Sequence, residues 1–191
     1  MIVDEGQLGF GWLDPGDKLE RCSHALLVEG KVWLVDAVFA EGVVERVRAL
    51  GEPAGVIQLL DRHGRDCAAW SDGLGVPLHV VPAGRVPFEV VPVVRSRWWR
   101  EVALWWPERR TLVCADALGT AMYFRAGAER LAVHPILRLR PPRRLGGLEP
   151  EHVLCGHGPG VHDDAPAAVR EALTTARRRL PRAWLGAIRR G

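Results

Sequence analysis

The chain has 191 residues, of which 48% are hydrophobic and 26% are charged, and its formal net charge at pH 7 is +3. A chain of this length can bury a sizeable core, and its apolar content excludes an intrinsically disordered protein. No apolar run approaches the roughly 18 residues that a membrane-spanning helix needs, so we expect no membrane-embedded body and no membrane partner.

The N-terminal part of the chain predicts a hairpin, a helix and a buried strand, in that order. Residues 25–29 and 32–36 are apolar runs on either side of a glycine-containing turn, which is typical of paired strands. Apolar residues at helical spacing predict a helix over residues 43–50 that ends at Gly51. Residues 55–60 are almost all apolar, as expected of a strand that is buried on both faces.

The rest of the chain predicts further strands separated by helices. A helix is expected from Cys67 to about Gly75, and residues 165–180 are expected to form a helix that Pro181 follows with a second, short one. The remaining expected strands are residues 78–81, 88–94, 102–106, 111–115 and 152–156. Strands mixed with helices predict a layered α/β domain with a mixed sheet. We therefore expect a single domain over residues 1–191, with an Arg-rich helical segment, residues 165–191, packed on it.

The basic residues are nearly all arginine, and they are unevenly placed. Among 26 basic residues only Lys18 and Lys31 are lysine. Arginine is suited to bidentate pairing with carboxylates, so this bias is consistent with the chemistry of a site or with the base composition of the gene. Residues 170–191 hold seven arginines and one acid. A basic terminal helix can bind nucleic acid, and we keep that as a minor alternative to a solvated helix face.

The cysteine pattern indicates free thiols in a reducing compartment. The four cysteines are widely spaced and form no C-x-x-C pair; they are Cys22, Cys67, Cys114 and Cys155. The first ten residues lack the basic and apolar regions of a signal peptide, so we expect a cytoplasmic protein. Cys67 follows a polar loop, and we expect it to pack in a helix rather than to act as a ligand or nucleophile.

Three polar clusters come directly after predicted buried strands. They are residues 61–66 (Asp-Arg-His-Gly-Arg-Asp), 115–119 (Ala-Asp-Ala-Leu-Gly) and 156–160 (Gly-His-Gly-Pro-Gly). A rigid sheet holds catalytic groups at its strand ends while loops give access to them, so we expect a functional site there. Each cluster alone is a weak signal, because an Asp after a strand is often a helix cap. Their order, together with the preceding hairpin, makes the pattern informative.

In this order the clusters resemble the metallo-β-lactamase-fold superfamily, with its metallo-hydrolase and glyoxalase II-like members. That family has a hairpin ending in Asp, an H-x-H-x-D-H loop, a strand ending in Gly-Asp and a last strand ending in Gly-His-Gly. The corresponding segments here are residues 26–36, 61–66, 115–116 and 156–158. The resemblance spans roughly residues 23–162. It implies a four-layer αβ/βα sandwich with a one- or two-metal site, usually zinc or iron, between the sheets.

The sequence departs from the family pattern at its metal ligands. Carried over residue by residue, five of the seven ligand positions keep a side chain that can bind a metal, namely Asp61, His63, Asp66, Asp116 and His157. Arg65 stands where the family has an aspartate, and Arg97 is the best alignment for a further histidine. Arginine stays protonated and has no free lone pair, so neither residue can bind a metal.

These departures leave two interpretations open, and we expect the first. In the first, salt bridges from the two arginines replace the metals, which gives a metal-free or weakly metal-binding protein with an anion-binding or scaffold role. In the second, one divalent ion, zinc or iron, supports hydrolysis of an ester, thioester or phosphoester, with Asp66 or Asp61 as general base. In either case Arg65, Arg97 and Trp98 are expected to contact a small anionic ligand. The sequence leaves the substrate and the oligomeric state open.

Overall fold

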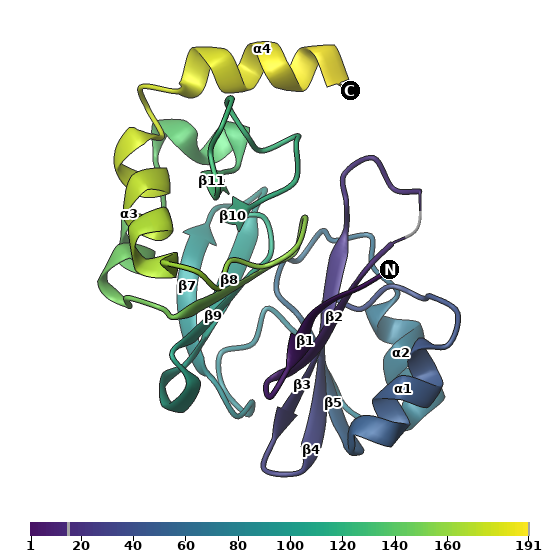
Figure 1. Cartoon of the computed structure of the whole chain (residues 1–191). Helices are drawn as coiled ribbons and strands as arrows, with labels where there is room; N and C mark the ends of the chain where they lie inside the picture. The colour runs from purple at the N-terminus through teal and green to yellow at the C-terminus, as the bar shows by residue number, and fades with distance from the viewer. Residues whose placement is uncertain (15, 191) are drawn as a thin grey trace.

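The N-terminal half of the chain forms one sheet that starts with two hairpins. The computed structural model describes residues 1–14 and 16–190, with side chains described as far as residue 185. In the order in which they are hydrogen-bonded, the strands of this sheet are β1 (Ile2–Gly6), β2 (Gly9–Leu13), β3 (Cys22–Val28), β4 (Lys31–Val35), β5 (Glu52–Gln58) and β6 (Leu78–Val80). The first four strands pair antiparallel, and β4, β5 and β6 pair parallel. Parallel strands need crossover connections, which α1 (Val43–Leu50) and α2 (Cys67–Leu74) supply on the outer face of the sheet (Figure 1).

The C-terminal half forms a second sheet that faces the first. Its strands, in hydrogen-bonded order, are β12 (His152–Cys155), β9 (Thr111–Cys114), β8 (Arg100–Trp106) and β7 (Glu89–Arg95). The pair β12–β9 is parallel and the other pairs are antiparallel. The smaller elements are η1 (Pro107–Arg109), β10 (Leu118–Gly119), β11 (Ala132–Val133), η2 (Pro135–Leu139) and η3 (Arg143–Gly147). Helix α3 (Ala165–Thr175) covers the outer face of this sheet, and α4 (Leu180–Arg190) lies beyond it over η2 (Figure 1).

The central strands of both sheets are buried on both faces, and this explains their continuous apolar sequences. In β5, Val56 packs under the helices while its neighbour Ile57 packs between the sheets, and both are fully buried. In β9, Leu112 packs toward α3 and Val113 packs between the sheets. Successive side chains on a strand point to opposite faces, so a helix–sheet–sheet–helix arrangement requires apolar residues at every position. The predicted four-layer αβ/βα sandwich is confirmed.

The two sheets are joined by backbone hydrogen bonds at two corners of the sandwich. At one corner the Cys22 amide donates to the Gly156 carbonyl over 2.8 Å. At the other, the Val102 amide donates to the Leu59 carbonyl over 3.0 Å, next to an isolated bridge between Leu60 and Glu101. Both corners lie at the end of the sandwich where β5, β9 and β12 finish, so the segments that follow these strands are held close together.

Two expectations about secondary structure need correction. The hairpin β1–β2 was not predicted, because glycines and acidic residues interrupt its apolar pattern. The helix expected over residues 165–180 ends at Thr175, and a turn precedes α4. The ring of Pro181 would clash with the Arg177 carbonyl in a continuous helix, which explains the break. Among the described residues, no helix combines the length and the apolar character that crossing a membrane requires.

Candidate functional site

Three of the five ligand candidates meet at the end of the sandwich where the two sheets are joined. His63 follows β5, Asp116 follows β9 and His157 follows β12. One ligand atom from each side chain lies within 4.8 Å of those of the other two. The Nε2 atoms of His63 and His157 lie 3.0 and 3.1 Å from the same atom, Oδ1 of Asp116. The three donor atoms therefore converge on one small region.

An oxygen atom lies behind the outward-facing nitrogen of each imidazole. Nδ1 of His157 lies 2.7 Å from the Leu19 carbonyl oxygen. Because a carbonyl oxygen only accepts, Nδ1 must carry a proton, and Nε2 of a neutral ring then presents its lone pair to Asp116. The Nε2 lone pair of His157 and Oδ1 of Asp116 are then both acceptors, and at 3.1 Å they must share a cation or a second proton. A backbone carbonyl or carboxylate behind a histidine is also the usual support of a metal-binding imidazole.

Asp36 supplies the corresponding support for His63. Its Oδ2 lies 3.3 Å from Nδ1 of His63, and its Oδ1 accepts a hydrogen bond from the Leu59 amide. Asp36 directly follows β4 and has a φ of 47°, a left-handed backbone conformation that few residues other than glycine, asparagine and aspartate adopt. It is the aspartate that ends the hairpin matched by the family resemblance, and here it fixes the orientation of a candidate ligand.

Burial and charge act in opposite directions on these groups. Burial lowers the pKa of His63, but Asp36 and Asp116 outweigh it and raise the pKa to about 9. Burial raises the pKa of Asp116, but hydrogen bonds from His157 and His63 outweigh it and hold the pKa well below its usual value. Without a metal ion the cluster therefore favours a protonated imidazole beside an ionised carboxylate. A divalent cation would satisfy the same carboxylate by replacing that proton.

Arg65 lies at this site, but its contacts differ from those expected. Its guanidinium donates to the Gly156 carbonyl over 2.8 Å and to the Cys22 carbonyl over 3.4 Å. Its Nε is buried and has no hydrogen-bond partner. In residues 1–14 and 16–185, neither Arg65 nor Arg97 forms an ion pair with a carboxylate. The expected network of two arginines on the carboxylates is thus not formed.

The two other carboxylate candidates lie outside the His63–Asp116–His157 cluster. Asp61 binds Arg100, with Oδ2 at 3.0 Å from Nε of the guanidinium. Asp66 precedes α2, and its Oδ2 accepts a hydrogen bond from the Phe39 amide over 2.8 Å. Each therefore organises a loop near the site.

Arg97 and Trp98 also lie away from the cluster. The guanidinium carbon of Arg97 sits 4.8 Å from the centre of the Trp98 ring, and Trp98 is 73% exposed. A different hollow, on the side of β7 and β8, contains Arg97 in its wall. Although the sequence aligns Arg97 with a family histidine, the structure does not place Arg97 beside His63 or Asp116.

A pocket of about 360 Å³ opens onto the cluster and contains residues that sequence reasoning missed. Its walls include Arg21, Tyr123, Phe124 and His134, which come from loops distant in the sequence. His134 contacts the Phe124 ring edge to face at 5.2 Å, and burial lowers its pKa to about 4. The only sequence signal for these residues was that His134 is a histidine without an assigned role.

Glu101 supports the site from beneath. It is almost fully buried, and it accepts hydrogen bonds from the Ala117 amide over 2.7 Å and from Nε1 of Trp99 over 2.8 Å. Burial and the nearby Asp116 raise the pKa of Glu101 to about 8. Because Glu101 holds the amide next to Asp116, it fixes the turn that presents this carboxylate.

Comparisons with known proteins identify the fold. No protein-family model matches the sequence, and no curated protein sequence matches it significantly. The crystal structure of DIM-1 metallo-β-lactamase matches with a TM-score of 0.59 and 11% identity, covering 93% of this chain and 97% of that one. ETHE1 from Myxococcus xanthus matches with a TM-score of 0.59 and 13% identity, over 89% of this chain and 86% of that one. TTHA1623 in a di-iron-bound form matches with a TM-score of 0.60 and 17% identity, over 84% and 98%.

The chain therefore has the metallo-β-lactamase fold, as the order of its polar clusters predicted. Identities of this size show the fold alone, and function has to be argued from the site.

Proposed function

We propose that the protein is a metal-dependent hydrolase that uses one divalent ion, zinc or iron, held by His63, Asp116 and His157. The observation that supports this proposal is the convergence of two imidazole Nε2 atoms on one carboxylate oxygen, with a carbonyl behind Nδ1 of His157 and a carboxylate 3.3 Å from Nδ1 of His63. Two imidazoles and a carboxylate form a donor set that suits zinc and iron. The likeness to metallo-β-lactamases and to di-iron proteins is consistent with it.

The positions of the remaining carboxylates favour one ion over two. Asp61 and Asp66, which could have completed a second set of ligands, are bound to Arg100 and to the Phe39 amide. Neither of them lines the pocket. The general-base role that the sequence offered to Asp61 or Asp66 is therefore not part of the proposal.

The pocket favours a small anionic substrate. Arg65 is fixed by two backbone carbonyls and lines the pocket as a permanent cation. Tyr123 and Phe124 line the same pocket and would exclude water from its inner wall. When bound, a divalent ion supplies acidification of a water molecule and polarisation of an ester, thioester or phosphoester oxygen. Arg65 would hold the anionic group of such a substrate beside the cluster.

Metal content and hydrolysis test this proposal together. We expect protein purified without chelators to lose one equivalent of zinc or iron when Asp116→Asn removes the shared carboxylate. Hydrolysis of a panel of p-nitrophenyl ester, thioester and phosphodiester substrates should be lost in the same variant. Asp61→Asn serves as the matched control, because that carboxylate binds Arg100 outside the pocket and should change neither quantity. Equal metal content in wild type and Asp116→Asn would contradict the proposal.

A metal-free anion-binding protein is the second candidate. The observation that favours it is that His63, Asp116 and His157 already contact one another directly, with Arg65 beside them as a fixed cation. In that case zinc and iron would not bind at this cluster in calorimetric titration. A small anion such as inorganic phosphate would bind instead, and Arg65→Gln would abolish its binding.

A further inference from the structure

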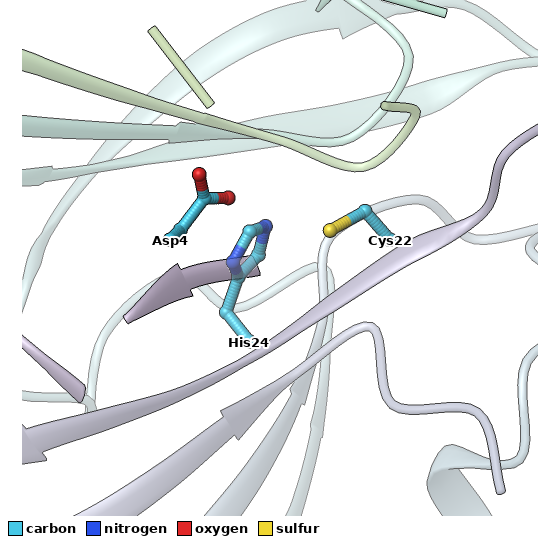
Figure 2. A group of neighbouring side chains, drawn as sticks. All are labelled: Asp4, Cys22 and His24. Carbon is cyan, nitrogen blue, oxygen red and sulfur yellow. The ribbon is translucent and has the colours of Figure 1, made fainter. Parts of the chain in front are cut away.

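A second group of metal-binding side chains lies inside the sandwich. Asp4 comes from β1, and Cys22 and His24 come from β3. One ligand atom of each lies within 4.8 Å of those of the other two. Figure 2 shows the Cys22 sulfur directed toward the His24 ring, with the Asp4 carboxylate beside that ring. In the described part of the chain no hydrogen bond joins any two of them, although the Cys22 sulfur is fully buried.

The orientation of His24 leaves one buried nitrogen without a partner. Its Nε2 lies 3.0 Å from the Cys155 carbonyl oxygen, which can only accept, so Nε2 carries the proton. With the proton on Nε2, the neutral ring has a bare lone pair on Nδ1. His24 is 1% exposed, and Nδ1 has no hydrogen-bond partner. A buried lone pair of this kind requires a donor or a cation.

A missing side chain leaves space in front of this nitrogen. Gly11 of β2 pairs directly with His24 of β3. A Cβ atom on Gly11 would lie 3.0 Å from Nδ1 of His24 and 3.3 Å from Oδ2 of Asp4. A methyl carbon of Val3 would lie 3.2 Å from the same Cβ atom, so the unpartnered nitrogen, the carboxylate oxygen and this methyl group border one narrow space.

We propose that Asp4, Cys22 and His24 form a binding site for a divalent transition-metal ion, of which Zn²⁺ fits best. Thiolate, imidazole and carboxylate are the donors that zinc prefers, and a water molecule would complete four-coordination. Loading breaks the S–H bond of Cys22 and forms a sulfur–metal bond, and the proton leaves to solvent. The thiolate and the Asp4 carboxylate then balance the charge of the ion. This site shares no ligand with the His63–Asp116–His157 cluster and does not depend on the proposed hydrolase function.

The surroundings of the three residues match those of a supported metal site. Behind His24 the proton on Nε2 is held by a backbone carbonyl. Behind Asp4, Oδ1 accepts from the Gly160 amide over 2.9 Å and lies 3.0 Å from Nε2 of His162. Such outer hydrogen bonds orient ligands and fix the tautomer of a metal-bound imidazole. Burial raises the pKa of the Cys22 thiol, so without a metal this cysteine stays protonated and unreactive.

A polar pocket reaches the Asp4 side of this group. Asp4 lines a pocket of about 660 Å³ that lies at the opposite ends of β9 and β12 from the candidate active site. Its walls also include Glu5, Glu108, Glu151, His152 and His162. Arg109 and Arg110 line the same pocket, but its four carboxylates outnumber these two cations, so the pocket attracts cations toward Asp4.

Cobalt substitution gives a test that reads this site alone. The metal-free full-length protein is titrated with Co²⁺, and we expect one equivalent to produce a near-ultraviolet charge-transfer band from sulfur to cobalt. Zn²⁺ should displace it. The His63–Asp116–His157 cluster contains no sulfur, so Asp116→Asn should retain the band even where the proposed function fails. If the wild-type protein gives no band, the space holds only a water molecule and the proposal is overturned.

Variants separate the ligands from their neighbours. Cys22→Ser should abolish the band, whereas Cys67→Ser is the matched control for exchanging a buried sulfur for oxygen and should retain it. Gly11→Ala keeps all three ligands but places a methyl group against Nδ1 of His24 and Oδ2 of Asp4, so it should weaken Co²⁺ binding. Circular dichroism verifies that each variant is folded. A band that persists in Cys22→Ser would assign the sulfur to another cysteine and overturn the proposal.

Discussion

Arg138 and Glu129 form an ion pair that is almost completely removed from solvent, with side-chain exposures of 0% and 1%. Two bonds join them, of 3.1 Å (Nη1 to Oε1) and 2.7 Å (Nη2 to Oε2). Nη2 of Arg138 also donates to the Phe124 carbonyl, and the Ala126 amide donates to Glu129. This pair therefore fixes the loop whose Phe124 lines the candidate active-site pocket.

Removing the charge of Glu129 should be costly at neutral pH. Glu129→Gln leaves Arg138 buried without a counter-ion, which lowers the free energy of unfolding by about 3–5 kcal/mol. Urea denaturation at pH 7 measures this difference. Glu171→Gln is the control, because Glu171 is an exposed partner of Arg179 and its loss should cost about 0.5 kcal/mol or less. Similar losses in the two variants would contradict this interpretation.

The same pair predicts how stability depends on pH. Burial raises the pKa of Glu129, but Arg138 outweighs it and holds the pKa below its usual 4.5. A carboxyl whose pKa is lowered by folding stabilises the protein above its unfolded value, and that contribution disappears as the pH falls through the folded value. Between pH 7 and pH 3 the wild-type protein should therefore lose more stability than Glu129→Gln. Parallel stability curves would show that another group dominates acid unfolding.

At the scale of elements, the loop after β12 requires a glycine next to a candidate ligand. Gly158 has a φ of +80°, and a Cβ there would lie 2.3 Å from Oγ1 of Thr120 and 2.6 Å from the Ala121 nitrogen. The amide of Gly158 also donates to the Glu20 carbonyl, which ties this loop to the segment before β3. The position of His157 thus depends on a close backbone approach that no side chain permits.

Two glycine substitutions separate backbone strain from steric clash. Gly16 also has a φ of +80°, but a Cβ there would meet nothing within 4 Å. Gly16→Ala should therefore lower the free energy of unfolding by about 1 kcal/mol, the cost of left-handed backbone alone. Gly158→Ala should cost clearly more and weaken metal binding at His157, as calorimetry with Zn²⁺ would measure. Equal effects of the two substitutions would refute the role of the close approach.

The C-terminal helices engage several of the arginines that make the end of the chain basic. Arg179 pairs with Glu129 and with Glu171, and Nε of Arg177 donates to the Leu139 carbonyl. Trp184 of α4 donates through Nε1 to the Pro135 carbonyl over 3.1 Å. The side chains of residues 189 and 190 lie outside the described residues. Nucleic-acid binding by this segment stays a minor proposal; among its arginines, Arg170 and Arg179 already form ion pairs within the chain.

At the scale of the whole molecule, stability depends on the apolar layer between the two sheets. Fully buried residues from both sheets form it, among them Leu26 and Ile57 from the first and Leu104 and Leu154 from the second. Leu104→Ala should lower the free energy of unfolding by about 2–5 kcal/mol, because it removes buried methyl groups and leaves a cavity. Denaturant unfolding measures this cost. Leu185→Ala is the control, since that side chain is exposed and should change stability by about 0.5 kcal/mol or less.

The layers of the fold could be predicted from the sequence because doubly buried strands leave continuous apolar runs. The hairpin β1–β2 could not be predicted in this way. Its glycines allow turns and close backbone approaches, and glycine has a low propensity for strands. The break before α4 follows from Pro181, but its exact position depends on which carbonyl the ring would strike.

For the candidate site, strand order predicted that His63, Asp116 and His157 would be neighbours. Strand order could not show that Asp61 and Asp66 lie outside this cluster. The direction of a side chain within a loop is set by tertiary contacts, such as the contact between Arg100 and Asp61. Residues that reach the pocket from distant loops, such as Arg21 and Phe124, leave no local pattern in the sequence.

The backbone bonds that join the sheets at two corners make the sandwich behave, at that end, like a flattened barrel. The Cys22–Gly156 and Val102–Leu59 bonds tie the ends of strands from one sheet to the other sheet. Shear between the sheets would have to break both corners at once. Changes in the shape of the pocket mouth would therefore come from the loops that line it rather than from sliding of the sheets.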